Sequence, residues 1–424
     1  MPKPDTAKTT QSIQRAGSVL PGALLRAERI RQNKGQKEVC FGICVPSYLS
    51  KIEHGSVCPD REILAALFGR LEIPYETDDR KLAQDEALLA RYFYNLQYEL
   101  DTHTVYQELH AHEQRLRYSE AAIDWLLVNA FEQTTADHLR LLEALEEHMD
   151  PKQHAYYRLL QAAIAADAGR KVLLCQEACE ILHHSYAMVR LCYACFLAGN
   201  YAAIHAMEQR VVAAAVEEGN TFRLADYFFI NGSAYACLNR EEAMMVYYER
   251  SIRLLQNTGW QDRLSTLYYN IGATCISLHK YEQALAYLHQ AEQTEGSSID
   301  ILHKKAIAWI RMGKPEEAAP FLDQLREALF NPKTSAGAPP CAFSTADRLK
   351  YEEAIMECHD GFLDDPLYLE LLEQLIQEIR KTQHFGHLYF YRDMIIEACK
   401  RQRKYKKALE FEKEISGNII NQGL

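Results

Sequence analysis

The chain has 424 residues, more than one ordinary domain holds and enough for an extended array of repeats. Hydrophobic residues make up 48% of it and charged residues 25%, proportions that exclude a disordered chain. No stretch approaches the ~20 apolar residues of a membrane-spanning helix, and residues 1–19 lack the apolar segment of a signal peptide. We therefore expect a cytoplasmic protein without a membrane partner, whose residues 1–19 form a disordered tail.

The net charge of −11 is spread unevenly along the chain. Residues 1–75 hold eleven Lys and Arg against seven Asp and Glu, so this part carries +4 and the remainder carries −15. A basic segment on an acidic body is typical of a protein whose first part meets a polyanion while the rest does not.

Residues 20–73 are predicted to form a small domain, the head, of four or five short helices. The first helix lies near Ala23–Gln32. Its inward-facing residues are expected to be Leu24, Leu25 and Ile30. A later helix begins at Pro46, where the missing amide hydrogen costs no hydrogen bond, and ends at Gly55, which suits the left-handed residue that follows a helix.

Two of these helices are joined by the tight turn GIC (42–44), which predicts a helix-turn-helix. With LLRAER before the turn and YLSKIEHG after it, the head resembles the repressor-type (Xre/Cro) class. The resemblance implies a partly buried salt bridge between Arg29 and Glu53 and a phosphate contact by Gln36. The residues expected at the DNA surface are Pro46, Ser47, Tyr48, Ser50 and Lys51. The same spacing also fits a plain helical bundle, but the motif residues fall in register together.

The turn is one residue shorter than in most repressors, and with the following run it resembles the RRNPP group of peptide-sensing regulators from Gram-positive bacteria (the Rgg, PlcR and PrgX type). The sequence departs from that group at two positions. The group usually has serine where this chain has Val45, and a polar residue where it has Pro46. Valine has no side-chain oxygen to cap the helix, and proline offers no amide to a phosphate.

A polar stretch at 74–85 is predicted to be a linker, and residues 86–424 form the body. The body has helical periodicity throughout and no alternating run that would indicate a strand. We expect an all-α protein, in which the helix-turn-helix domain is followed by a right-handed solenoid of tetratricopeptide-like (TPR-like) repeats.

The repeats recur at uneven spacing. LYYNIGATCISLHKYEQALAYLHQAE (267–292) matches the TPR pattern of paired helices. YFFINGSAYACLNREEAMMVYYERSI (227–252) is a second copy, aligned here with one residue fewer between Gly232 and Ala243. Further copies lie at 302–325, 188–207 and 394–411, and a Pro/Gly/Ser-rich loop is predicted at 331–345.

A solenoid of this kind has a concave groove lined by the first helix of each pair. Counting from the small residue of each first helix places two cations and an amide on one side of the groove, with aromatic residues beside them. Such side chains suit the backbone and terminal carboxylate of an extended peptide. The residues predicted to bind a peptide are Arg190, Tyr193, Phe229, Asn231, Tyr269, Asn270 and Lys304.

Catalytic and metal-binding motifs are not evident. Five of the twelve cysteines (Cys192, Cys195, Cys237, Cys275 and Cys399) lie within apolar helical patterns, where a free cysteine behaves as a small hydrophobe. The chain has no GxxxxGK[ST], HExxH or GxSxG motif. We expect no metal, no cofactor and no enzyme activity.

By its resemblance to the RRNPP group, the chain is expected to be a quorum-sensing transcriptional regulator. It would bind double-stranded operator DNA as a homodimer and a short signalling peptide in its groove. Two alternatives stay open. The body could bind a protein antirepressor or toxin, as in a mobile-element repressor. The chain could also be a TPR scaffold whose head no longer binds DNA, an alternative that only Val45 and Pro46 support.

Overall fold

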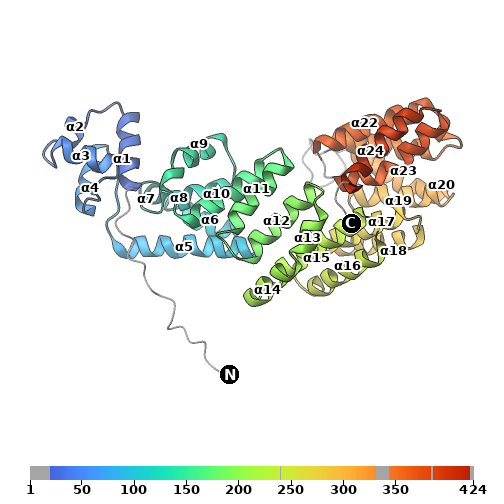
Figure 1. Cartoon of the computed structure of the whole chain (residues 1–424), viewed down its shortest axis with the longest axis horizontal. Helices are drawn as coiled ribbons and strands as arrows, with labels where there is room; N and C mark the ends of the chain where they lie inside the picture. The colour runs from blue at the N-terminus through green and yellow to red at the C-terminus, as the bar shows by residue number, and fades with distance from the viewer. Residues whose placement is uncertain (1–19, 239, 331–342, 383–384, 421–424) are drawn as a thin grey trace, which may run out of the picture. The chain divides into compact units, whose positions relative to one another are not determined.

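The computed structural model describes residues 20–238, 240–330, 343–382 and 385–420, so the predicted tail and most of the predicted loop at 331–345 lie outside it. The described residues are helical and contain no strand (Figure 1). They divide into two compact units, Met1–Ile164 with Glu177–Leu182, and Ala165–Gln176 with His183–Leu424.

The first unit contains the head and the first helices of the body. Its helices are α1 (Leu20–Arg31), α2 (Gln36–Cys40), α3 (Pro46–Glu53), α4 (Arg61–Arg70), α5 (Asp79–Tyr98), α6 (His103–His110), α7 (Glu113–Arg117), α8 (Ala122–Glu132), α9 (Ala136–Ala144), the short 3₁₀ helix η1 (Glu146–His148) and α10 (Pro151–Ile164). Helix α11 (Ala168–Cys179) contributes residues to both units.

The head is a bundle of α1–α4 around one apolar core, with Leu25, Leu49 and Leu67 fully buried. The prediction for Ile30 is wrong, because its side chain is 58% exposed. Glu28 is buried on α1 instead, where it accepts hydrogen bonds from Arg31 and Gln32. Hydrophobic periodicity detects only apolar residues, so it cannot predict the burial of Glu28. It therefore predicted the wrong residue, Ile30, to be buried.

The segment predicted as a linker is folded rather than extended. Helix α5 begins at Asp79, and Tyr75 stacks on Phe68 of the head with 5.0 Å between ring centroids. Burial raises the pKa of Tyr75 to about 12. The buried Asp85 accepts two hydrogen bonds from Arg115, at 2.5 and 2.6 Å. The head therefore continues into the first body helices without a free tether.

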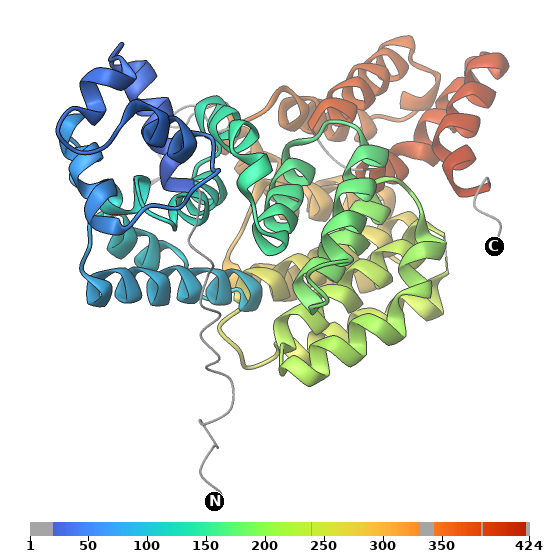
Figure 2. The ribbon, with the colours of Figure 1, turned by 60° about the vertical axis from the view of Figure 1, so that its left-hand side comes forward.

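The second unit consists of paired helices that lie side by side (Figure 2). They are α12 (Ser185–Leu197), α13 (Tyr201–Ala206), α14 (Glu208–Glu218), α15 (Thr221–Cys237), α16 (Glu241–Leu255), α17 (Gln261–Ser277), α18 (Tyr281–Glu295), α19 (Ile299–Arg311), α20 (Pro315–Phe330), α21 (Thr345–Glu357), η2 (Phe362–Asp364), α22 (Pro366–Thr382), α23 (Phe385–Arg401) and α24 (Tyr405–Ile420).

Each predicted repeat coincides with one helix pair, but the alignment of the copy at 227–252 needs correction. Met244 is buried and Ala243 is only partly buried, so Met244 holds the inward position on α16. Gly232 and Met244 are then separated by the same number of positions as Gly272 and Ala284 in the next repeat. The copy is not one residue shorter, because a flexible methionine fills the position that the pattern gives to a small residue.

The glycine of each first helix marks a close approach to the second. A Cβ atom on Gly232 would lie 2.5 Å from the ring of Tyr248, and one on Gly272 would lie 2.8 Å from Leu288 Cγ. Both partner side chains are fully buried, so they cannot move aside into solvent. These two glycines therefore set the helix spacing of their repeats.

We predict that Gly232→Ala destabilises the second unit by ~1–3 kcal/mol, since an added methyl group must displace a packed ring. The measurement is urea unfolding followed by circular dichroism. Gly259→Ala is the control, because nothing lies within 4 Å of a Cβ at that position. Equal midpoints for the two variants would show that the α15–α16 spacing adapts without cost.

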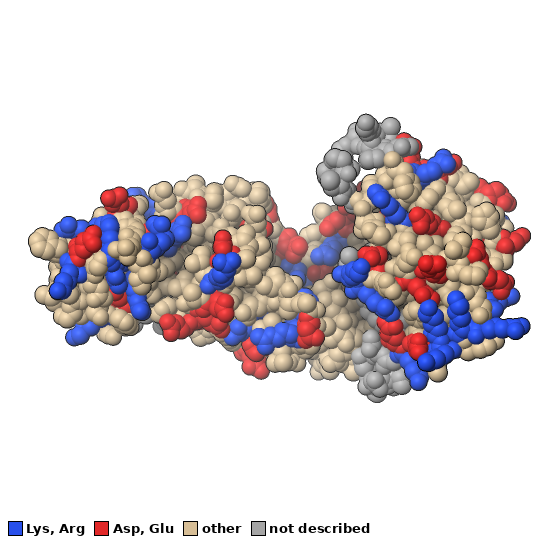
Figure 3. All heavy atoms as spheres, turned by 90° about the horizontal axis from the view of Figure 1, so that it is seen from above, with Lys and Arg blue, Asp and Glu red and all other residues tan. Residues whose placement is uncertain are grey.

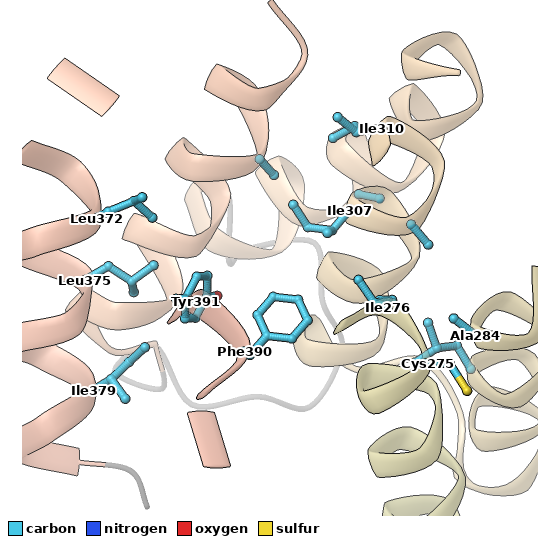
Figure 4. Close-up of a cluster of buried hydrophobic side chains, with 14 of the residues drawn as sticks. Cys275, Ile276, Ala284, Ile307, Ile310, Leu372, Leu375, Ile379, Phe390 and Tyr391 are labelled. Atoms are coloured by element: carbon cyan, nitrogen blue, oxygen red, sulfur yellow. The ribbon is translucent and has the colours of Figure 1, made fainter. Parts of the chain in front are cut away.

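Helices from the C-terminal part of the chain complete the core of this unit. Figure 4 shows the rings of Phe390 and Tyr391 on α23 between the leucines of α22 on one side and Ile276 and Ile307 on the other. Helix α23 thus packs across the first helices of earlier repeats, where it becomes part of the groove wall.

Candidate functional site

The exposed face of α3 is the candidate DNA surface. Pro46 occupies the first turn, and Val45 before it is extended and makes no side-chain cap. Ser47 and Lys51 are exposed on the same face. Figure 3 shows Lys and Arg side chains over the surface of the head on the side in view. A short helix with an exposed hydroxyl and an exposed ammonium can contact base edges or phosphates.

The predicted pair of Arg29 and Glu53 is present. Arg29 donates from Nε to Glu53 at 2.6 Å and from a terminal nitrogen at 2.9 Å, and it also donates to the Lys34 carbonyl at 2.9 Å. The side chain of Glu53 has no exposed surface. The pair therefore ties α1 to the end of α3 and fixes the angle at which α3 is presented.

Two predicted DNA-surface residues, with Gln36, are placed differently from expectation. Gln36 donates from Nε2 to Glu53 at 2.7 Å, so its side-chain amide joins the ion pair of Arg29 and Glu53. Tyr48 is partly buried and packs against the head core. Ser50 is partly exposed, and its carbonyl accepts from the ring of His54. Gln36, the first residue of α2, thus ties the start of α2 to Glu53 on α3, and its predicted phosphate contact stays a prediction.

The second candidate site is a cavity of about 500 Å³ in the second unit. Its wall comes mainly from α12, α15, α17, α19 and α23, the first helices of their pairs, and also includes Tyr248 of α16 and Glu295 of α18. Five of the seven residues predicted to bind a peptide line it: Tyr193, Phe229, Tyr269, Asn270 and Lys304. This volume is within the range of small-ligand pockets.

Arg190 and Asn231 do not line this cavity, so these two predictions need correction. Asn231 is completely buried and donates to the Tyr227 hydroxyl at 3.1 Å. Asn231 lies one residue after the position of α15 that the repeat pattern places in the groove. Its side chain therefore points to the side of α15 that packs inward. Arg190 is partly exposed on α12, and the cavity is lined by other residues of this helix, Tyr193 and Phe196.

Lys304 lines the cavity and is almost completely buried. Its side chain is 4% exposed, and its Nζ lies 3.3 Å from the ring centroid of Phe390 and 3.4 Å from His303 Nδ1. Burial, with repulsion from Lys350, lowers the pKa of Lys304 to about 7. A group with this pKa changes charge readily near neutral pH.

Sequence reasoning missed the residues that α23 adds to the wall. Tyr389 and Phe390 line the cavity beside Lys304, although they are far from the predicted groove in sequence. Ser233 also lines the cavity and donates to the Phe229 carbonyl at 2.9 Å. The periodic pattern predicts which face of a repeat is concave, but it carries no information about a distant helix that closes over that face.

No group of His, Cys, Asp and Glu in the described ranges is placed to hold a metal ion. The five cysteines expected in apolar patterns are buried and unbridged. Burial raises the pKa of Cys237 and Cys275 to about 11, which leaves their thiols protonated. None of the described helices has both the length and the apolar character needed to cross a bilayer.

Comparison with known proteins gives similarity of structure alone. No protein-family model and no curated protein matches the chain. The Rap protein complexed with Competence and Sporulation Factor matches 80% of this chain and 99% of its own, with 12% identity and a TM-score of 0.58. The apo form of the quorum sensor NprR from B. thuringiensis also matches 80% and 99%, with 15% identity and a TM-score of 0.57.

This chain has the TPR-like helical fold of those two proteins. Bacillus thuringiensis PlcR in complex with the peptide PapR7 and DNA matches 74% of this chain and 99% of its own at 13% identity. Its TM-score of 0.26 is too low to indicate a common arrangement of helices. The fold class expected from the sequence is therefore confirmed, and the roles of the two candidate sites go beyond these comparisons.

Proposed function

We propose that this protein is a peptide-sensing transcriptional regulator. The head binds double-stranded DNA through α3, and the cavity of the second unit binds a short peptide. The observation that carries this proposal is the cavity itself, because its wall contains most of the groove positions chosen from the repeat pattern. The similar folds of Rap, solved with Competence and Sporulation Factor, and of the quorum sensor NprR support a sensing role for such a cavity.

The chemistry of the cavity suits an extended peptide. Tyr193, Phe229 and Tyr269 offer apolar surface for side chains, while Asn270 can pair with backbone amide groups. We propose that these residues bind a ligand and do not catalyse its turnover. We propose that the protein acts in the cytoplasm, where both the DNA and an imported peptide are accessible.

We also propose that the regulator binds DNA as a homodimer. One recognition helix contacts only a few base pairs, and two heads on adjacent half-sites multiply the specificity. Peptide binding would then change the distance between the two heads and so alter the affinity for DNA. The peptide site and the DNA site would be coupled in this way.

We predict that the Ser47→Ala/Lys51→Ala variant weakens binding to the duplex upstream of the gene by ~10–100-fold, because base-edge and phosphate contacts are lost together. Fluorescence anisotropy at several salt concentrations measures this, and the slope of the logarithm of affinity against that of salt should fall by about 1 for the lost lysine. Lys381→Ala is the control, since this exposed lysine lies on α22.

The same titration separates the competing functions. Wild-type protein that shows no preference between this duplex and unrelated DNA, with or without peptides from the culture medium, would favour a scaffold whose head no longer reads DNA. Sequence preference that responds to a small protein but not to any peptide would favour a mobile-element repressor.

A further inference from the structure

The cavity is lined by the buried amine of Lys304, which has no anionic partner among the described residues. The described carboxylates form no ion pair with Lys304, and the neighbours of its Nζ are the ring of Phe390 and a nitrogen of His303. The adjacent Lys305, equally buried, is paired with Glu292 at 2.5 Å. Of these two neighbouring lysines on α19, only Lys304, which has no ion pair among the described residues, lines the cavity.

The nearby carboxylates contact other groups, although Oε1 of Glu353 accepts no hydrogen bond from the described residues. Asp300 accepts from Lys350 at 3.0 Å, and Glu353 lies 3.1 Å from His303 Nε2 and 3.6 Å from Arg311. An ammonium ion in such a site is costly unless it is paired, because the surroundings cannot replace its hydration. The fold does not supply the pairing group, while the cavity gives a ligand access to the ammonium.

We propose that Lys304 is the anchor for a carboxylate of the bound ligand, and that the ligand of this cavity is therefore a peptide that presents a carboxylate to this lysine. This inference rests on the proposed peptide binding and deepens it. The carboxylate is either the peptide's C-terminus or the side chain of an Asp or Glu. Phe390 and Tyr269 lie on the same wall and contact the apolar groups next to that carboxylate.

Binding is then linked to proton uptake. In the free protein, burial lowers the pKa of Lys304 to about 7, so a large share of the side chains is neutral at pH 8. A carboxylate beside the amine favours its charged form and raises that pKa again. The complex therefore holds more protons than the free protein above pH 7, and affinity falls as pH rises through that range.

Other groups around Lys304 must be separated from this effect. The charged and titratable groups that face it are His303, Asp300 and Arg311 on α19, Lys350 and Glu353 on α21, and Tyr391 on α23. Burial lowers the pKa of His303 well below its usual range, so this ring stays neutral. Burial and the neighbouring Glu357 raise the pKa of Glu353 well above its usual range, so Glu353→Gln is the required control.

The test uses the full chain and three random-sequence pools of short synthetic peptides. The first pool has a free C-terminal carboxylate and no acidic side chain, the second has a C-terminal amide and one Asp or Glu, and the third has an amide and no acidic residue. Binding is detected by thermal stabilisation, and isolated binders are measured by calorimetry. We expect binders from the first or the second pool, which identifies the source of the carboxylate.

Lys304→Met should weaken those binders by about 10–100-fold, as expected for a lost charge-assisted hydrogen bond, while Lys305→Met should have little effect. Calorimetry at pH 8 in buffers of different ionisation enthalpy should show proton uptake by the wild type and by Glu353→Gln. If Lys304→Met does not fold, Lys304→Arg serves instead. Arginine keeps the charge and cannot lose its proton, so it should retain the preference for carboxylates and abolish the uptake.

Equal binding from the third pool, unaffected by Lys304→Met, would overturn the inference and leave peptide binding intact. Unchanged proton uptake in Lys304→Arg would also overturn it. Failure of all three pools to bind would overturn both the inference and the proposed peptide sensing.

Discussion

Arg311→Met is expected to cost the second unit ~3–5 kcal/mol, the typical effect of removing one partner of a buried ion pair. Arg311 donates to both oxygens of Glu357, at 2.8 and 3.0 Å. The side chains of Glu357 and Glu353 have no exposed surface. Tyr368 also donates to Glu357, at 2.8 Å. The substitution would leave two carboxylates in the interior without their shared cation.

The pH dependence distinguishes this cause from a simple packing defect. In the wild type, burial opposes the charge of Glu357, but Arg311 outweighs it and holds the pKa of Glu357 below its ordinary value of 4.5. This contribution to stability is present above pH 4.5 and is lost as pH falls through the folded-state pKa. In Arg311→Met the folded-state pKa lies above 4.5, so stability falls as pH rises and acid partly rescues the variant.

Urea unfolding followed by the fluorescence of Trp309 on α19 measures this effect, in a Trp125→Phe/Trp260→Phe background so that one tryptophan remains. Arg311→Met/Glu357→Gln is the matched control and should recover part of the loss at neutral pH, because one of the uncompensated charges is gone. A single variant with the same pH slope as the wild type would show that the ion pair is not the source of its instability.

The helix pairs of the body could be predicted because each repeat carries its own signal. Gly272 and Ala284 are small because two helices touch there, and that contact lies within one short stretch of chain. The positions that face the groove follow from the same repeat pattern. This is why Phe229 and Tyr269, which line the cavity, could be predicted from the sequence. In the head, Arg29 and Glu53 came from a resemblance, and no periodicity indicates that pair.

The remaining features depend on contacts between distant segments. The sequence around Lys304 does not show that Phe390 packs over it. It also does not show that Glu353 and Glu357 of α21 contact His303 and Arg311, on the same helix as Lys304. The stretch around Tyr75 looks like a linker because its polar residues dominate the composition, although one aromatic ring is enough to hold it against the head. Features of this kind depend on which distant segments bury a residue, so no local sequence pattern predicts them.

Arg29→Met should destabilise the head by ~3–5 kcal/mol, because it strands the buried carboxylate of Glu53. Hydrogen exchange of the α1 and α3 amides measures this, since it reports on the head separately from the second unit. Arg29→Met/Glu53→Leu should recover most of the protection, because an apolar pair of similar volume often replaces a buried ion pair without loss. Unchanged exchange in the single variant would show that the pair contributes little to stability.

The double variant then separates stability from DNA binding. In the wild type, Gln36 is held by Glu53, and the same carboxylate fixes the end of α3 relative to α1. With Leu at position 53 the head is folded, but the start of α2 loses the hydrogen bond that orients it. We expect the double variant to keep its hydrogen-exchange protection and to bind the duplex upstream of the gene several-fold more weakly. Full affinity in a protected double variant would mean that packing alone sets the angle of α3, and that the ion pair acts only on stability.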